Sequence, residues 1–174
     1  MAGLRCAFTG HRPQRFMFGA EDDARCTALK GVIRAQILSL IAQGYEVFYT
    51  GMALGTDTWC AEAVLSLKAA HPNIRLIAVV PCQTQADAWP AKQRQRYFNI
   101  LMRCDGMKAI SRLYTPTCML ERNRYLVDNA DIVLAVYDGK PRGGTAHAVR
   151  YAKARPLPVI IIDPDSLDIV HNAC

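Results

Sequence analysis

The chain has 174 residues, of which 51% are hydrophobic and 21% charged, and its formal net charge is +6 at pH 7. These values are typical of one soluble globular domain with a substantial core, and no apolar run reaches the ~20 residues that a membrane helix needs. The basic excess is spread along the chain, so it favours a phosphate-bearing ligand and, as the alternative, nucleic acid.

Hydrophobic periodicity predicts strands that alternate with helices. Leu29, Ile33 and Ile37 recur at a helical spacing, and Gly44 follows as a stop signal. In chain order we predict a strand at 4–9, a helix at about 21–43, a strand at 46–50, a helix at about 57–70, a strand at 74–80, a helix-prone stretch at 83–103, a strand at 108–113, a helix at 119–129, a strand at 131–137, a helix at 144–154 and a strand at 159–163. Residues 1–163 are expected to form the domain, and residues 164–174 a loose C-terminal tail.

This alternation predicts the α/β class: a Rossmann-like open parallel sheet with helices on both faces, in a single domain. Such sheets bind ligands beyond the carboxyl ends of their strands, near the point where the strand order reverses. The unusual residues of this chain follow predicted strands, at Thr9 to Arg12, at Thr50 and Gly51, at Pro81, and at Asp138 to Thr145. We therefore expect these loops to converge on one edge of the sheet.

A glycine-rich loop that opens a helix is the strongest local signal for a phosphate site. Gly143, Gly144 and Thr145 follow the buried strand at 131–137 and begin the helix at 144–154. Glycine allows backbone N–H groups to approach an anion closely, and the helix N-terminus adds partial positive charge. Arg122, in the preceding helix, would add a full charge.

Four motifs together give the chain a family resemblance: Thr9-Gly-His-Arg-Pro13, Gly51-Met-Ala-Leu-Gly-Thr-Asp57, Glu121-Arg-Asn-Arg124 and Gly143-Gly-Thr145. Over roughly residues 4–163 the chain resembles the SLOG superfamily of Rossmann-like proteins, and within it the YpsA-like group, a domain of unknown function. The resemblance implies binding of a nucleotide or a nucleotide-derived ligand, such as an ADP-ribose-like molecule or a nucleoside monophosphate. A sensor role is compatible with this.

More distantly, the chain is similar to LOG-type phosphoribohydrolases and to DprA. The hydrolases carry a Met-x-x-Arg segment, matched here by Met119 and Arg122, and a glycine-rich loop followed by a catalytic glutamate. After Thr145 this chain has Ala146 and His147, so the glutamate is absent. Since glycosidic hydrolysis needs a carboxylate, this departure argues against that activity, unless Asp57 or Asp138 substitutes.

Each residue of the predicted ligand site also has an ordinary structural interpretation. Gly10 and Gly51 are either tight turns or points of close ligand approach, and His11 and Arg12 are either surface residues or phosphate contacts. If the protein is an N-glycosidase, Arg122 and Asp57 are the predicted catalytic residues; the third alternative is DprA-like binding of single-stranded DNA. The predicted ligand-binding residues are Gly10, His11, Arg12, Gly51, Gly55, Thr56, Asp57, Arg122, Gly143, Gly144 and Thr145.

The remaining expectations concern compartment, metal and partners. Seven cysteines, none of them in a C-x-x-C pair, favour free thiols in a reducing cytoplasm. The N-terminus runs into the first predicted strand without a signal-peptide pattern, so we expect a cytoplasmic protein. No cluster of residues has metal-ligand spacing, so no metal is predicted, and the only expected cofactor-like molecule is the nucleotide ligand. The apolar content permits a homodimer.

Overall fold

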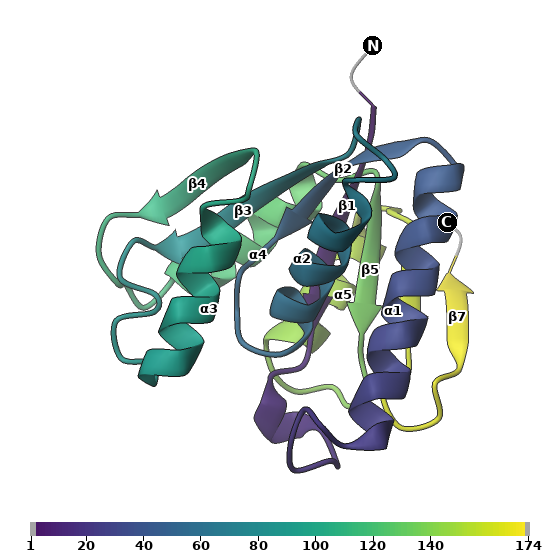
Figure 1. Ribbon diagram of the computed structural model, residues 1–174, viewed down its shortest axis with the longest axis horizontal. Coiled ribbons are helices and arrows are strands. Elements are labelled where there is room, and N and C mark those ends of the chain that lie inside the picture. The colour runs from purple at the N-terminus through teal and green to yellow at the C-terminus, as the bar shows by residue number, and fades with distance from the viewer. Residues whose placement is uncertain (1–2, 173–174) are drawn as a thin grey trace.

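The computed structural model describes residues 3–172 and forms a three-layer α/β structure (Figure 1). Its elements are β1 (Leu4–Gly10), a short 3-10 helix η1 (Pro13–Arg15), α1 (Ala24–Ala42), β2 (Tyr45–Thr50), α2 (Thr56–Leu67), β3 (Arg75–Cys82), α3 (Ala91–Leu101), β4 (Gly106–Ser111), α4 (Cys118–Asp128), β5 (Ile132–Val136), α5 (Gly144–Ala154), β6 (Val159–Ile162) and β7 (Ile169–Asn172). The predicted α/β fold with an open, mostly parallel sheet is confirmed.

The seven strands follow the order β4-β3-β2-β1-β5-β6-β7 in one sheet. The pairs from β4 through β6 are parallel, and β1 lies between β2 and β5. The chain moves outward from β1 through β2 and β3 to β4, and then returns to place β5 on the other side of β1. The carboxyl ends of β1 and β5 therefore form the switch point at which such sheets bind ligands.

Helices cover both faces of the sheet, as Figure 1 shows, with α1, α2 and α3 on the near face and α4 and α5 behind it. The near layer packs around Phe8, Phe48 and Leu76, which are almost fully buried. The far layer packs around Val79 and Val133. Side chains alternate between the two layers along each strand, so both faces of the central strands are buried and their apolar runs are explained.

Local signals set the limits of α1. The carboxylate of Asp23, the N-cap residue, accepts a hydrogen bond from the backbone N–H of Arg25 at 2.8 Å. At the other end Gly44 adopts a φ of 92°, a left-handed conformation that glycine reaches without strain and that commonly ends helices. The predicted stop at Gly44 is therefore confirmed. No helix within residues 3–172 combines the length and apolarity needed to cross a membrane.

Two segments differ from the sequence predictions. The expected loose tail contains β7, which pairs antiparallel with β6 from Ile162↔Ile169 to Val159↔Asn172, because the turn after Asp163 folds the chain back along the sheet edge. Residues 173 and 174 of that tail lie outside the described part. The strand predicted to close at Pro81 continues to Cys82. Pairing between β3 and β2 ends at Ala78, so no strand on the β2 side of Pro81 needs the N–H that proline lacks.

Candidate functional site

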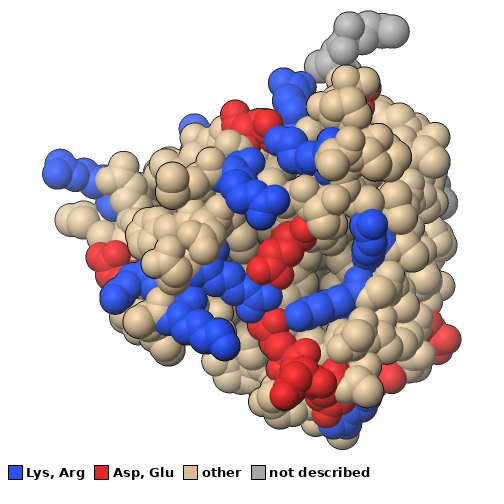
Figure 2. All heavy atoms as spheres, in the orientation of Figure 1, with Lys and Arg blue, Asp and Glu red and all other residues tan. Residues whose placement is uncertain are grey.

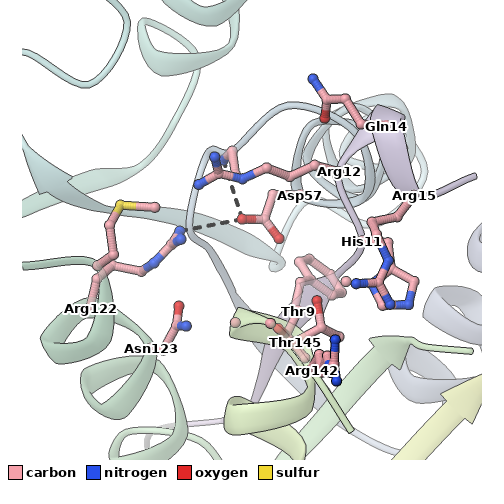
Figure 3. Close-up of a pocket in the computed structure, with 16 residues that line it drawn as sticks. Thr9, His11, Arg12, Gln14, Arg15, Asp57, Arg122, Asn123, Arg142 and Thr145 are labelled. Atoms are coloured by element: carbon pink, nitrogen blue, oxygen red, sulfur yellow. Dashed lines mark hydrogen bonds and ion pairs between the residues drawn. The ribbon is translucent and has the colours of Figure 1, made fainter. Parts of the chain in front are cut away.

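A pocket of about 420 Å³ lies at the switch point, beyond the carboxyl ends of β1 and β5 (Figure 3). That volume falls within the usual range for small-molecule sites. Four arginines and one carboxylate line it, so the site is strongly electropositive. The lining residues are Phe8, Thr9, Gly10, His11, Arg12, Gln14, Arg15, Ala53, Asp57, Met119, Arg122, Asn123, Arg142, Gly143, Gly144 and Thr145.

A buried ion pair forms one wall of this pocket. Arg122, on α4, donates from Nη1 to Oδ2 of Asp57, on α2, at 3.3 Å, and the two side chains are only 5% and 7% exposed. The same Oδ2 accepts the backbone N–H of Ala53 at 3.2 Å. Burial raises the pKa of Asp57, which the Arg122 charge opposes, while the guanidinium keeps its own proton. Figure 3 shows the side chains of both Arg12 and Arg122 reaching toward the Asp57 carboxylate.

Arg122 is not fully satisfied by the protein. Its Nε is buried and has no hydrogen-bond partner within the described residues. An unpaired buried donor on a charged group is costly, so such groups usually meet a partner such as water or a ligand. The free edge of Arg122 is therefore a candidate contact for an acceptor atom within the pocket.

Gly51 is placed where it makes room for this arginine. A Cβ atom at position 51 would overlap Nη1 of Arg122 and lie 2.7 Å from Oδ2 of Asp57. Gly10 has a similar packing role, because a Cβ there would overlap the side chain of Thr56. These two glycines let α2 and α4 approach the strand ends closely, which brings Asp57 and Arg122 together.

The N-terminus of α5 forms a second wall. Gly143 is the N-cap residue with a φ of 95°, and no side chain caps the helix. The first N–H groups of a helix have no partner within the helix, so the backbone at Gly144 and Thr145 offers donors beside the pocket. The side chain of Arg142 lines the pocket next to these groups. Phosphate binding at residues 143–145 stays a prediction.

His11 and Asp138 link the loops after β1 and β5. The His11 Nε2 lies 2.8 Å from Asp138 Oδ1. Oδ2 of Asp138 accepts a hydrogen bond from Nη2 of Arg15 at 3.3 Å. Burial lowers the pKa of His11, against the opposing effect of Asp138. Burial alone would raise the pKa of Asp138, but the backbone N–H of Lys140 and the His11 contact lower it to about 2. Asp138 therefore carries a negative charge at neutral pH.

The structure brings together most of the residues predicted for the site. Gly10, His11, Arg12, Asp57, Arg122, Gly143, Gly144 and Thr145 all line the one pocket. Gly51, Gly55 and Thr56 lie behind its wall instead. Thr56 donates from Oγ1 to the backbone carbonyl of His11 at 3.0 Å, and Gly55, with a φ of 86°, lies close to the same carbonyl. Contact between these three residues and a ligand stays a prediction.

Several pocket residues were not singled out from the sequence. Gln14, Arg15, Asn123 and Arg142 line the pocket. Arg15 and Arg142 are exposed; Arg15 ends the three-residue helix η1 and Arg142 lies in a loop, and a single arginine in such a short segment carries no pattern. Asn123 could have been found, because it follows Arg122 and lies four residues after Met119 on one helix, a spacing that places side chains on the same face.

None of the cysteines within residues 3–172 lines the pocket. The six cysteines within residues 3–172 are free, and five of them are buried; Cys174 lies outside the described residues. In the part of the chain that the structure describes, no group of three His, Cys, Asp or Glu side chains is arranged to hold a metal ion.

The sheet order and the arginine-lined pocket at its switch point define a Rossmann-like α/β protein. The chain belongs to the YspA SLOG family, whose model, YpsA, matches residues 6–167. The UPF0398 protein BH1768 of Halalkalibacterium halodurans is 31% identical over 166 residues, covering 92% of this chain and 88% of that protein. A UPF0398 protein of Bacillus licheniformis is 26% identical over 174 residues, covering 97% and 95%.

Two solved structures share the fold. The DNA processing protein A of Helicobacter pylori, which binds single-stranded DNA, has a TM-score of 0.59 and 20% identity, over 92% of this chain and 65% of that one. The X-ray structure of TM1055 has a TM-score of 0.54 and 15% identity, over 90% of this chain and 72% of that one. At these identities the likeness concerns the fold.

Proposed function

We propose that this protein binds a nucleotide or nucleotide-derived ligand at the carboxyl edge of its sheet and acts as a sensor of that ligand. The observation that carries this proposal is the buried Arg122, whose Nε lacks a partner and whose side chain lines an electropositive pocket. A ligand that brings acceptor atoms would satisfy it. The uncapped N-terminus of α5, beside Arg142, would hold a phosphate group through backbone N–H groups.

The single carboxylate among the arginines supports a ligand that carries a sugar as well as a phosphate. Oδ2 of Asp57 accepts hydrogen bonds from Ala53 and Arg122. A carboxylate accepts about four hydrogen bonds in all, so Asp57 retains acceptor capacity. A ribose hydroxyl can donate to Asp57 and accept from Arg122, whereas an ionised phosphate oxygen can only accept.

A thermal-shift screen with AMP, ADP, ATP, NAD, ADP-ribose and other nucleoside monophosphates tests this function, because a bound ligand stabilises the folded state by mass action. Arg142→Ala removes an exposed pocket charge and should weaken the affinity of any ligand that binds by roughly 5- to 30-fold. Arg34→Ala, which removes an exposed arginine of α1, is the matched control and should leave the affinity unchanged. Absence of a shift with every ligand would contradict the proposal.

An N-glycosidase is the second candidate, favoured by the Asp57 carboxylate at the pocket wall. Such an enzyme would release free base from a nucleoside monophosphate, and Asp57→Asn would abolish the release. The Arg122 pair makes Asp57 a weaker candidate than a free catalytic carboxylate, because its charge is already engaged. Binding without base release would leave the sensor function and remove this one.

Binding of single-stranded DNA is the third candidate, favoured by the net charge of +6 and by the fold shared with the Helicobacter pylori protein. Such binding should weaken steeply as salt rises, because cations are released from the phosphate backbone. On the face seen in Figure 2, basic side chains lie among acidic ones instead of forming one continuous basic surface. A mobility assay without a shift at low salt would remove this candidate.

A further inference from the structure

His11 occupies a fixed position at the pocket although it is a titratable residue. Its backbone N–H donates to the carbonyl of Val136 at 3.2 Å, and its carbonyl accepts from the N–H and the hydroxyl of Thr56. Its ring meets Phe16 and Tyr137 in edge-on contacts, with centroids 6.3 and 5.7 Å away. The ring is therefore held in place by contacts on several sides and is only 3% exposed.

The Nε2 atom of His11 has two partners, and both belong to Asp138. It lies 3.2 Å from the backbone nitrogen of Asp138, whose N–H can donate to an unprotonated Nε2. It also lies 2.8 Å from Oδ1 of Asp138, which can accept from a protonated Nε2. Because one residue offers a donor and an acceptor at the same place, His11 can gain a proton without a large movement of the loops.

The charges that face His11 oppose one another. Asp138 is negative, whereas Arg15 and Lys140 lie 3.3 and 3.5 Å from the same carboxylate and are positive; Tyr137 contributes only its ring. In the free protein, burial and these two cations keep the His11 pKa below its ordinary value of 6.5. An anion in the pocket would neutralise the nearby arginines and would itself favour a protonated imidazole.

Building on the proposed function, we propose that His11 is a specificity-determining contact that takes up one proton when an anionic ligand enters the pocket, with Asp138 as its fixed counter-ion. Proton binding and ligand binding are then coupled, and each favours the other. The free protein would hold His11 neutral, and the ligand-bound protein would hold it charged between Asp138 and the ligand anion. The site would thus prefer anionic ligands over neutral analogues of the same shape.

Calorimetric titration with ADP-ribose tests the inference. The two phosphoryl groups of its pyrophosphate stay singly ionised near neutral pH, whereas a phosphate monoester has a second pKa near 6 that would confuse the measurement. Titrations at pH 7.5 in two buffers of different ionisation enthalpy give the number of protons taken up. We expect a value approaching one for the wild type, and a dissociation constant that rises up to about tenfold per pH unit above neutrality.

Two variants and a control separate the outcomes. His11→Gln should still bind ADP-ribose but without proton uptake, and Asp138→Asn should reduce the uptake because it removes the counter-ion. His71→Gln, at a histidine outside the pocket, should behave as the wild type does. Equal binding enthalpy in both buffers for the wild type, or undiminished uptake in His11→Gln, would overturn the inference and leave the proposed function standing. No binding of ADP-ribose at all would overturn the inference by removing the event to which it is coupled, and the ligand screen then decides the function separately.

Discussion

At the scale of single residues, the site depends on the absence of a side chain at Gly51. Since a Cβ there would overlap Arg122, we expect Gly51→Ala to lower the free energy of unfolding by about 1–3 kcal/mol, as overpacked interiors do. The variant should also lose ligand affinity, because Arg122 must move. Urea denaturation and the ligand screen measure the two effects.

Gly31→Ala is the matched control for this substitution. Gly31 lies inside α1 and a Cβ there would meet no atom within 4 Å. Alanine is a better helix former than glycine by about 1 kcal/mol, so this variant should be as stable as the wild type or more stable. If both variants behaved alike, the steric explanation for Gly51 would be wrong.

Removing one member of the buried ion pair should lower the free energy of unfolding more than Gly51→Ala does. Arg122→Met leaves Asp57 buried without its cation, which we expect to cost about 3–5 kcal/mol at pH 7. The lone carboxyl would then have a raised pKa in the folded state. A group of that kind destabilises above its unfolded pKa, so the loss should shrink as pH falls and Asp57 takes up a proton.

Chemical denaturation of Arg122→Met between pH 7 and pH 4 measures this trend. The double variant Arg122→Met with Asp57→Asn removes both charges and should recover part of the stability at pH 7. A loss that is independent of pH, or a double variant no more stable than the single one, would show that the charge of Asp57 is not the cause.

The sequence allowed some of these residues to be predicted and concealed others. Gly143 to Thr145 could be found because a strand, a glycine pair and a helix follow one another in the chain. The role of Gly51 could not, because its steric partner Arg122 is 71 positions away and only the fold brings the two together. The His11–Asp138 contact joins residues 127 positions apart and was equally out of reach of local patterns.

At the scale of elements, an arginine of α3 forms ion pairs with two carboxylates, one of them on α2 and the other in the segment before α1. Arg96 donates to Glu21 at 2.7 Å and to Glu62, on α2, at 2.6 Å, while Lys30 also donates to Glu21 at 2.7 Å. Burial alone would raise the pKa of Glu21, but these hydrogen bonds lower it to about 2. The contribution of Glu21 to stability is therefore present above its ordinary pKa and is lost as pH falls toward 2.

We expect Glu21→Gln to lower the free energy of unfolding by about 1–2 kcal/mol at pH 7, with allowance for its partial exposure to solvent. The difference from the wild type should shrink between about pH 4.5 and pH 2, where Glu21 itself is protonated. Glu121→Gln, at an exposed residue of α4, is the control. A difference that stays constant across this range would contradict the explanation.

The edge strand β7 protects its neighbour β6. A chain that ends after Leu167 keeps that residue, which packs against the core, and removes β7. The exposed edge of β6 then offers unpaired backbone groups to another chain. We expect self-association at micromolar concentration and a lower unfolding midpoint, measured by light scattering and thermal melting. The control variant Val170→Thr, in the full chain, should keep the association state and the unfolding midpoint of the wild type.

The elements themselves were mostly predictable, because each has its own periodicity. The strand at Ile132–Val136 is apolar throughout, and α1 repeats apolar residues at helical spacing. The segment before α3 was less clear: the helix begins at Ala91, after turns, although residues from 83 onward are helix-prone. β7 could not be foreseen, because four residues at a sheet edge gain their structure from pairing with β6 and carry no pattern of their own.

At the scale of the whole molecule, the order of the strands could be inferred only in part. The alternation of elements indicates a parallel sheet, and the rule that such sheets bind ligands beyond the carboxyl ends of their strands gave the predicted position of the site. The chain returns from β4 to place β5 beside β1, and this step depends on long-range packing and on strand pairs such as Cys6↔Ile132. Such pairs cannot be predicted from the sequence of either segment alone.

This strand order has a consequence for the folding kinetics. The pocket joins residues 10–15 to residues 142–145, so it cannot form until β1 and β5 have paired. Contacts so distant along the chain form late, and a nascent chain on the ribosome lacks the site until residue 145 has emerged. We therefore expect a bound ligand to slow unfolding while leaving the refolding rate unchanged, a difference that stopped-flow measurement of both rates would show.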